Sequence, residues 1–141
     1  MTKKEAAKFL ALVKLAYPRS YKDIDKETAL ATINMWQASF PELPYVIMEL
    51  AFDHYRKTNK FEPTVADMID ELKRLHYEAL MDLKTAESFD DMKLAERCHW
   101  VMRETLMYKS PAYISTNYEA VKERDMFPLP KGGKDENLQR P

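Results

Sequence analysis

The spacing of hydrophobic residues along the chain predicts helices throughout its first 109 positions. Apolar residues recur every three or four positions, which is the period of a helix with one buried face. The helices are expected at residues 2–16, at 25–40, from 44 to about 60, from 64 to about 83, and from 88 to about 109. A weaker pattern in "ISTNYEAVKER" predicts a short sixth helix at 114–124.

The apolar positions of two of these helices define specific buried faces. In the third helix the expected face consists of Val46, Ile47, Leu50, Ala51, His54 and Tyr55. In the fifth helix it consists of Phe89, Met92, Ala95, His99, Met102 and Leu106. Each set follows the helical period, so each should pack against neighbouring helices.

Capping motifs mark where several helices begin. A Ser or Thr followed three positions later by an acid can form a capping box, in which each side chain binds the other residue's backbone N–H. Such pairs stand at Thr2 and Glu5, at Thr64 and Asp67, and at Ser88 and Asp91. We therefore expect helix starts at these three places.

The glycine content supports the helical interpretation. The chain has only two glycines, both at positions 132–133, so it lacks the residue that most readily adopts the positive φ of tight hairpins. We predict an all-α fold, a compact bundle of four to six helices over residues 1–109. Residues 110–141 are expected to form a short helix and a flexible C-terminal tail that contains prolines and both glycines.

Charge and cysteine content narrow the functional classes. The net charge of −1 does not favour duplex DNA as a primary partner, because DNA-binding domains are usually strongly basic. The one cysteine, Cys98, cannot form an intramolecular disulfide and suits a reducing cytoplasm. No uncharged apolar run is long enough to cross a membrane, and the N-terminal segment is interpreted as a helix and not as a signal peptide.

The sequence offers no arrangement typical of an enzyme. The three histidines and Cys98 lack the spacings that place two metal ligands on one helical face, and no glycine-rich loop could hold a phosphate. The acidic pairs 70–71 and 90–91 are better explained as solvated helix surfaces. We expect no catalytic residue, no metal and no cofactor.

Two groups of residues are candidates for binding. Tyr55, Arg56, Lys57 and Lys60 combine an aromatic ring with cations, as in sites for single-stranded nucleic acid, although cations at a helix C-terminus also complement the helix dipole. In the tail, Met126, Phe127, Pro128 and Leu129 could form a linear motif for a protein partner, or could fold back on the chain's own helices.

Three stretches together resemble a known family. They are "KKEAAKFLALVKLAYP", the Trp-containing "ATINMWQASFPELPYVIMELAFDHYRKTNKF", and "EPTVADMIDELKRL". Over about residues 1–80 the chain resembles the small helical helicase loader/inhibitor proteins of tailed bacteriophages. The resemblance implies a non-enzymatic protein in the host cytoplasm. Its expected partners are a hexameric DnaB-like replicative helicase and a replisome-organiser protein that binds the origin.

The resemblance also suggests where the helicase would be bound. In the family the flexible C-terminal region binds the helicase, which points here to residues 126–129. This chain departs from that pattern because residues 88–109 are predicted to be helical, so the partner could instead meet that helix near Trp100 and Tyr108. The alternative hypotheses are a small nucleic-acid-binding module at a replication origin and a regulatory helical interaction protein.

Overall fold

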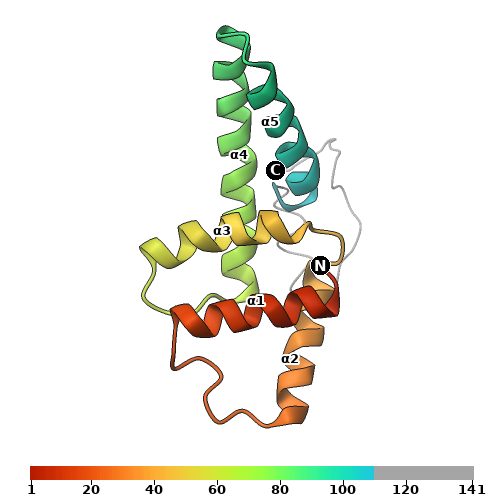
Figure 1. Cartoon of the computed structure of the whole chain (residues 1–141), viewed down its shortest axis with the longest axis vertical. Coiled ribbons are helices and arrows are strands. Elements are labelled where there is room, and N and C mark those ends of the chain that lie inside the picture. The colour runs from red at the N-terminus through yellow and green to blue at the C-terminus, as the bar shows by residue number, and fades with distance from the viewer. Residues whose placement is uncertain (110–141) are drawn as a thin grey trace, which may run out of the picture. The chain divides into compact units, whose positions relative to one another are not determined.

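The computed structural model describes residues 1–109, which form helices without any strand (Figure 1). This confirms the all-α class. The helices are α1 (Lys3–Ala16), α2 (Lys26–Ser39), α3 (Tyr45–Thr58), α4 (Val65–Ser88), α5 (Met92–Thr105) and the 3₁₀ turn η1 (Leu106–Lys109). The predicted sixth helix and the tail lie outside the described residues.

The chain divides into two compact units, Met1–Glu71 and Leu72–Pro141. We call them unit 1 and unit 2. Their boundary lies inside α4, whose first residues belong to unit 1. The expected division at residue 109 coincides with the end of the described residues and stays a prediction.

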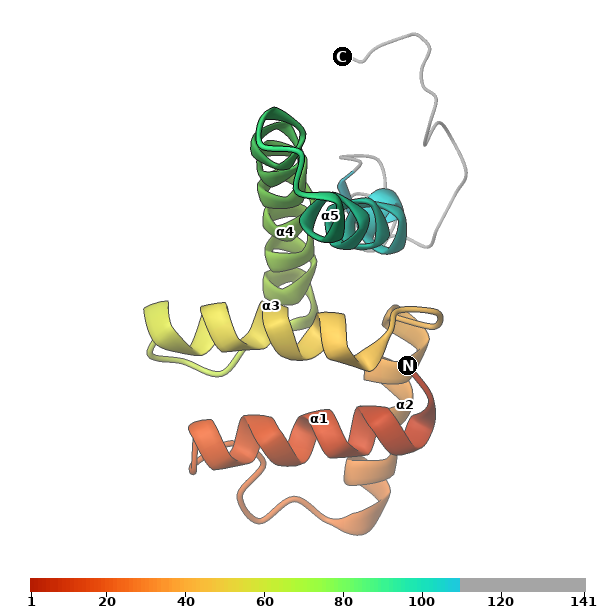
Figure 2. The same cartoon turned by 45° about the horizontal axis from the view of Figure 1, so that its top comes forward.

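Unit 1 is built on α1, which packs against α2 and α3. Figure 2 shows α1 and α3 side by side, with α2 crossing near the start of α1. An aromatic cluster fills the space between them: Phe9 lies 5.3 Å from Trp36 and 5.4 Å from Phe52 between ring centroids. All three rings are almost fully buried, so large apolar area from three helices forms one core.

The amino group of Met1 closes the turn between α2 and α3. It donates hydrogen bonds to the carbonyl oxygens of Phe40 (2.7 Å), Pro41 (3.2 Å) and Leu43 (3.0 Å). These carbonyls follow the end of α2, where helix geometry leaves acceptors without intrahelical donors. Burial lowers the pKa of the ammonium, while the charges of Glu5 and Glu42 oppose that change.

Unit 2 contains most of α4, together with α5 and η1, and α5 runs back along α4 (Figure 1). Its core includes the buried cluster Ala79, Leu83, Cys98 and Val101. The N-cap of α5 is Asp91, whose carboxylate accepts the N–H of Leu94.

Two of the three predicted capping boxes are confirmed. Thr2 and Glu5 exchange hydrogen bonds at the start of α1, as do Thr64 and Asp67 at the start of α4. The box at Ser88 is wrong, because α4 continues through Ser88 and α5 begins only after Asp91.

The predicted face of the third helix was partly wrong. Ile47, Ala51 and Tyr55 are buried, but Val46 is 49% exposed and Leu50 is 40% exposed. Met48 and Phe52 are buried in addition to the expected residues. The stripe is rotated because α3 meets the Phe9 ring through Phe52.

The predicted face of the fifth helix needs a larger correction. Phe89 and Met92 are 77% and 81% exposed, because they belong to the turn between α4 and α5 and to the first position of α5. His99 is also exposed, and Leu106 is 43% exposed. The buried residues of α5 are instead Cys98, Val101 and Thr105.

Candidate functional site

An open groove of about 670 Å³ lies on unit 1. One wall is formed by residues 16–20, at the end of α1 and in the loop that follows it. The other wall is formed by Arg56 and residues 59–62, at the end of α3 and in the segment that leads to α4. A volume of this size is typical of a binding site for a small ligand or a few residues of peptide.

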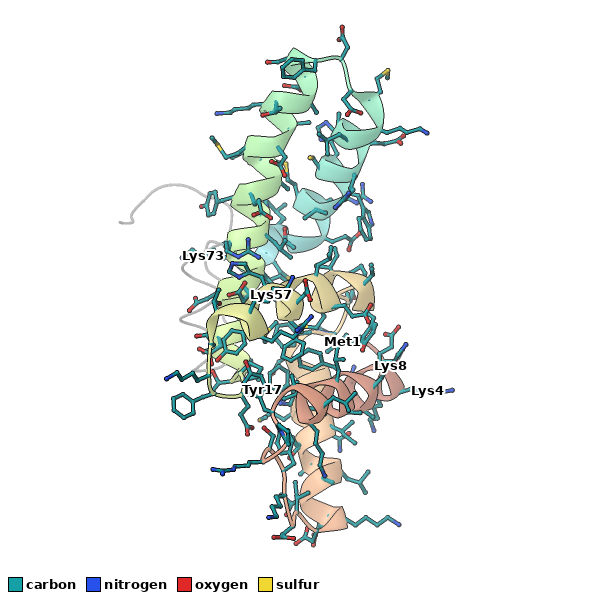
Figure 3. All side chains as sticks on the ribbon, turned by 60° about the vertical axis from the view of Figure 1, so that its left-hand side comes forward. Met1, Lys4, Lys8, Tyr17, Lys57 and Lys73 are labelled. Carbon is teal, nitrogen blue, oxygen red and sulfur yellow. The ribbon has the colours of Figure 1, made fainter. Side chains whose placement is uncertain are left out.

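Tyr17 joins the two walls of the groove. Its hydroxyl donates a 2.9 Å hydrogen bond to the carbonyl oxygen of Asn59, and its ring lies 6.3 Å from the Phe52 ring. Burial raises the pKa of Tyr17, and the nearby charge of Arg56 opposes the change. Figure 3 shows Tyr17 in unit 1 beyond the end of the α1 ribbon, where it can fix the position of residues 59–62.

Ser20 is a buried polar residue in the groove wall. It is 3% exposed, and its backbone N–H donates to the carbonyl oxygen of Tyr17 at 2.9 Å. Within residues 1–109 its hydroxyl has no hydrogen-bond partner. Buried hydroxyls are normally paired, so this group is available to a bound molecule.

The cations around the groove are of two kinds. Arg56 and Lys57 share Asp53, at 2.6 Å and 3.0 Å between nitrogen and carboxylate oxygen, and their hydrogen bonds lower the pKa of Asp53. Arg19 and Lys60 line the groove and form no ion pair with any residue in the described range. Their positive charge is therefore not neutralised by a contact within this part of the chain.

Tyr55 is enclosed rather than displayed. It is 6% exposed, and its hydroxyl donates to the carbonyl oxygen of Phe61 (3.0 Å) and to Asp67 Oδ2 (3.3 Å). Burial, followed by the charge of Asp67, raises its pKa to about 12. Its ring is not exposed for stacking on a base. A nucleic-acid contact by Arg56, Lys57 or Lys60 stays a prediction.

The predicted partner residues in unit 2 differ in accessibility. Tyr108 is 1% exposed and belongs to the core, whereas Trp100 is partly buried and packs beside the cluster of Ala79 and Val101. Only Trp100 of this pair presents surface there. Residues 126–129 lie outside the described residues, so their role also stays a prediction.

Apolar surface that the periodicity did not predict is present at the turn of the helical hairpin. Phe89 and Met92 are largely exposed, and Tyr77 and Met81 on α4 are 47% and 60% exposed. The spacing of 77 and 81 by four residues was a signal for one helical face, but periodicity alone does not say whether that face is covered.

A buried polar pair lies inside unit 2. His76 Nδ1 is 3.1 Å from the hydroxyl oxygen of Thr105, and that hydroxyl donates to the carbonyl oxygen of Val101 at 2.7 Å. A hydroxyl has one proton, so its oxygen must accept from His76, which places a proton on Nδ1. This pair links α4 to α5 in the core.

Metal and membrane sites were also sought in residues 1–109. No group of three or more His, Cys, Asp or Glu side chains there is arranged to hold a metal ion. No helix in that range combines the length and the apolar character that crossing a bilayer requires.

Comparison with known proteins gives one result. Residues 1–69 match the family model for the N-terminal domain of the phage gene 39 protein. That phage protein is a helicase loader/inhibitor, so the match supports the helicase-loader family for this chain. The matched residues cover nearly all of unit 1. Neither the curated proteins nor the solved structures include a match to the chain.

Proposed function

We propose that this protein is a non-enzymatic adaptor of phage or prophage DNA replication. It binds a hexameric DnaB-like helicase in the host cytoplasm, loads or restrains it, and meets a replisome-organiser protein at the origin. The observation that carries the proposal is the match of residues 1–69 to the N-terminal domain of a phage helicase loader/inhibitor. The three sequence stretches quoted above support the same family.

The adaptor acts by selecting among states of the helicase ring. A bound protein shifts a conformational equilibrium only by the difference in its affinity for the two states. Restraint therefore requires stronger binding to a ring that is not translocating, and release requires that organiser and DNA favour another state. This activity needs no nucleotide hydrolysis by the adaptor itself.

Two surfaces are proposed for the helicase contact. The first is the tail motif Met126, Phe127, Pro128 and Leu129, whose apolar side chains can anchor an extended segment in a groove of the partner. The second is the α5 region around Trp100 and Tyr108, of which Trp100 offers the accessible surface.

The test is a titration of the full chain against the phage and host helicases, followed by size-exclusion chromatography with light scattering, with and without ATP. We expect a complex of the ring with this protein. Phe127→Ala with Leu129→Ala should weaken it by at least about tenfold, because buried anchors dominate interface energy. Asn137→Ala serves as the control in the same tail.

The outcomes separate the two surfaces and test the function. Weakening by Trp100→Ala but not by the tail variant would move the interface to unit 2. Absence of a complex with either helicase, in either nucleotide condition, would contradict the proposed function.

A further inference from the structure

The groove on unit 1 has a hydrogen-bonding group that the fold leaves unused. Ser20 is 3% exposed, and its hydroxyl has no partner among residues 1–109. An unpaired buried hydroxyl costs free energy that a protein retains only for some other benefit. A bound molecule with a polar atom at this wall would satisfy it.

The charge of the groove indicates an anionic ligand. Arg19 and Lys60 lie on opposite walls, and neither forms an ion pair within the described residues. Glu62 is the single acid of the lining and also interacts with the Tyr21 hydroxyl. Arg56 is already engaged by Asp53. The groove therefore presents two available cations, enough for one or two carboxylates.

The remaining lining is apolar. Ala16, Pro18 and Phe61 contribute hydrophobic surface, and Phe61 is 80% exposed at the rim. Exposed aromatic residues beside cations are typical of surfaces that hold a partner's apolar side chain next to an acidic one. The ligand should thus carry both kinds of side chain.

A peptide fits this surface better than single-stranded nucleic acid. Nucleic-acid binding depends on many cations along a strand and on several stacking rings. Here Arg56 and Lys57 share one carboxylate, and the Tyr55 ring is buried. A peptide needs only a few contacts, and its backbone can bond to a hydroxyl such as that of Ser20.

We propose that this groove binds an acidic and partly apolar peptide segment of a partner protein. Arg19 and Lys60 pair with its carboxylates, Phe61 and Pro18 contact its apolar side chains, and the Ser20 hydroxyl bonds its backbone. The site is separate from the helicase contacts proposed above, and it does not depend on them.

The test is a titration of the ¹⁵N-labelled full chain, observed by amide chemical shifts. The probes are a capped hexapeptide that alternates aspartate and leucine, its counterpart with lysine in place of aspartate, and an oligothymidylate octamer. We expect saturable shifts at residues 16–20 and 59–62 with the acidic peptide alone. Added salt should weaken this binding, because the cations are near the surface.

Variants then assign the contacts. Arg19→Gln with Lys60→Gln should weaken binding roughly three- to tenfold, the effect of losing two solvent-exposed ion pairs. Lys14→Gln with Lys22→Gln removes the same charge from exposed residues outside the groove and should leave affinity unchanged. Ser20→Ala should weaken binding while raising the Tm of the free protein, because it removes an unpaired buried hydroxyl.

Each alternative outcome overturns the proposal. Shifts at the groove with oligothymidylate but not with the acidic peptide would make it a nucleic-acid site. Acidic-peptide shifts elsewhere, or equal weakening by the two double variants, would show that the groove is not the site. An absence of shifts at millimolar peptide would show that it does not bind this class of ligand.

Discussion

The Tyr55 hydroxyl lies 3.3 Å from Asp67 Oδ2, the same carboxylate oxygen that accepts the backbone N–H of Thr64 at 2.9 Å. One oxygen therefore caps α4 and anchors the end of α3. The hydroxyl also donates to the carbonyl oxygen of Phe61. These bonds fix the segment between α3 and α4, which carries one wall of the groove.

This arrangement predicts a pH-dependent contribution of Tyr55 to stability. Its pKa is raised to about 12 in the folded protein, so the unfolded chain loses the phenolic proton first as pH rises. The stabilisation is complete below about pH 10, the usual pKa, and declines as pH rises through the folded value. The difference in unfolding free energy between the native sequence and Tyr55→Phe should therefore shrink between about pH 10 and 12.

Urea unfolding of both proteins at about pH 8, 10 and 11.5 would measure that difference. Near pH 8 we expect Tyr55→Phe to cost about 1–2 kcal/mol through its lost hydrogen bonds. Lysine titration affects both proteins alike, so it cancels in the comparison. A difference that stays constant over the whole range would contradict the assigned role of the Tyr55 hydroxyl.

A second prediction concerns neighbouring apolar residues of α3. Phe52 is 1% exposed and contacts Phe9, whereas Leu50 is 40% exposed. Phe52→Ala should lower the unfolding free energy by about 3–5 kcal/mol, because it leaves a cavity in the aromatic core. Leu50→Ala should cost less than about 1 kcal/mol. Chemical denaturation of the two variants measures both, and similar losses would contradict the observed face.

These two residues also show how far the sequence could predict the fold. Helical period and capping residues indicated α1 to α4, because both signals are local. Which side of α3 is buried depends on where Phe9 lies, and Phe9 is far away in the sequence. Leu50 and Phe52 are both apolar, so periodicity could not choose between them.

The groove was still less accessible to prediction. Its walls come from residues 16–20 and from the segment after α3, which meet only because Tyr17 reaches Asn59. The sequence did single out Arg56 and Lys60, but not that Asp53 engages the first of them. Ser20 gave no sequence signal, because burial of a loop serine follows from tertiary packing alone.

A third prediction tests the buried polar pair of unit 2. Thr105→Val keeps the side-chain shape but removes the acceptor of His76 Nδ1–H, so it should cost about 1–3 kcal/mol of unfolding free energy. Thr85→Val on the exposed surface of α4 is the matched control, with an expected change within about 0.5 kcal/mol. Imidazole ¹⁵N shifts should report the Nδ1–H form of His76, and finding only the Nε2–H tautomer would contradict the assigned hydrogen bond.

The last prediction concerns the reactivity of Cys98. The residue is 4% exposed, and burial raises the pKa of its thiol, with the charge of Asp82 adding to the effect. The thiolate is the reactive form, so both low access and low thiolate population should slow its reaction with a disulfide reagent. We expect the native protein near neutral pH to react at least about a hundredfold more slowly than the protein in urea, because reaction requires opening of the core.

A relocated thiol provides the control for this measurement. In Thr85→Cys with Cys98→Ala, the cysteine lies on the exposed surface of α4, and its rate should be nearly the same with and without urea. Fast reaction of Cys98 in the native protein, at the rate of that exposed thiol, would show that α5 opens readily from α4. The Cys98 cluster would then contribute little to the stability of unit 2, and an interface at Trp100 would form on a helix that is only loosely held.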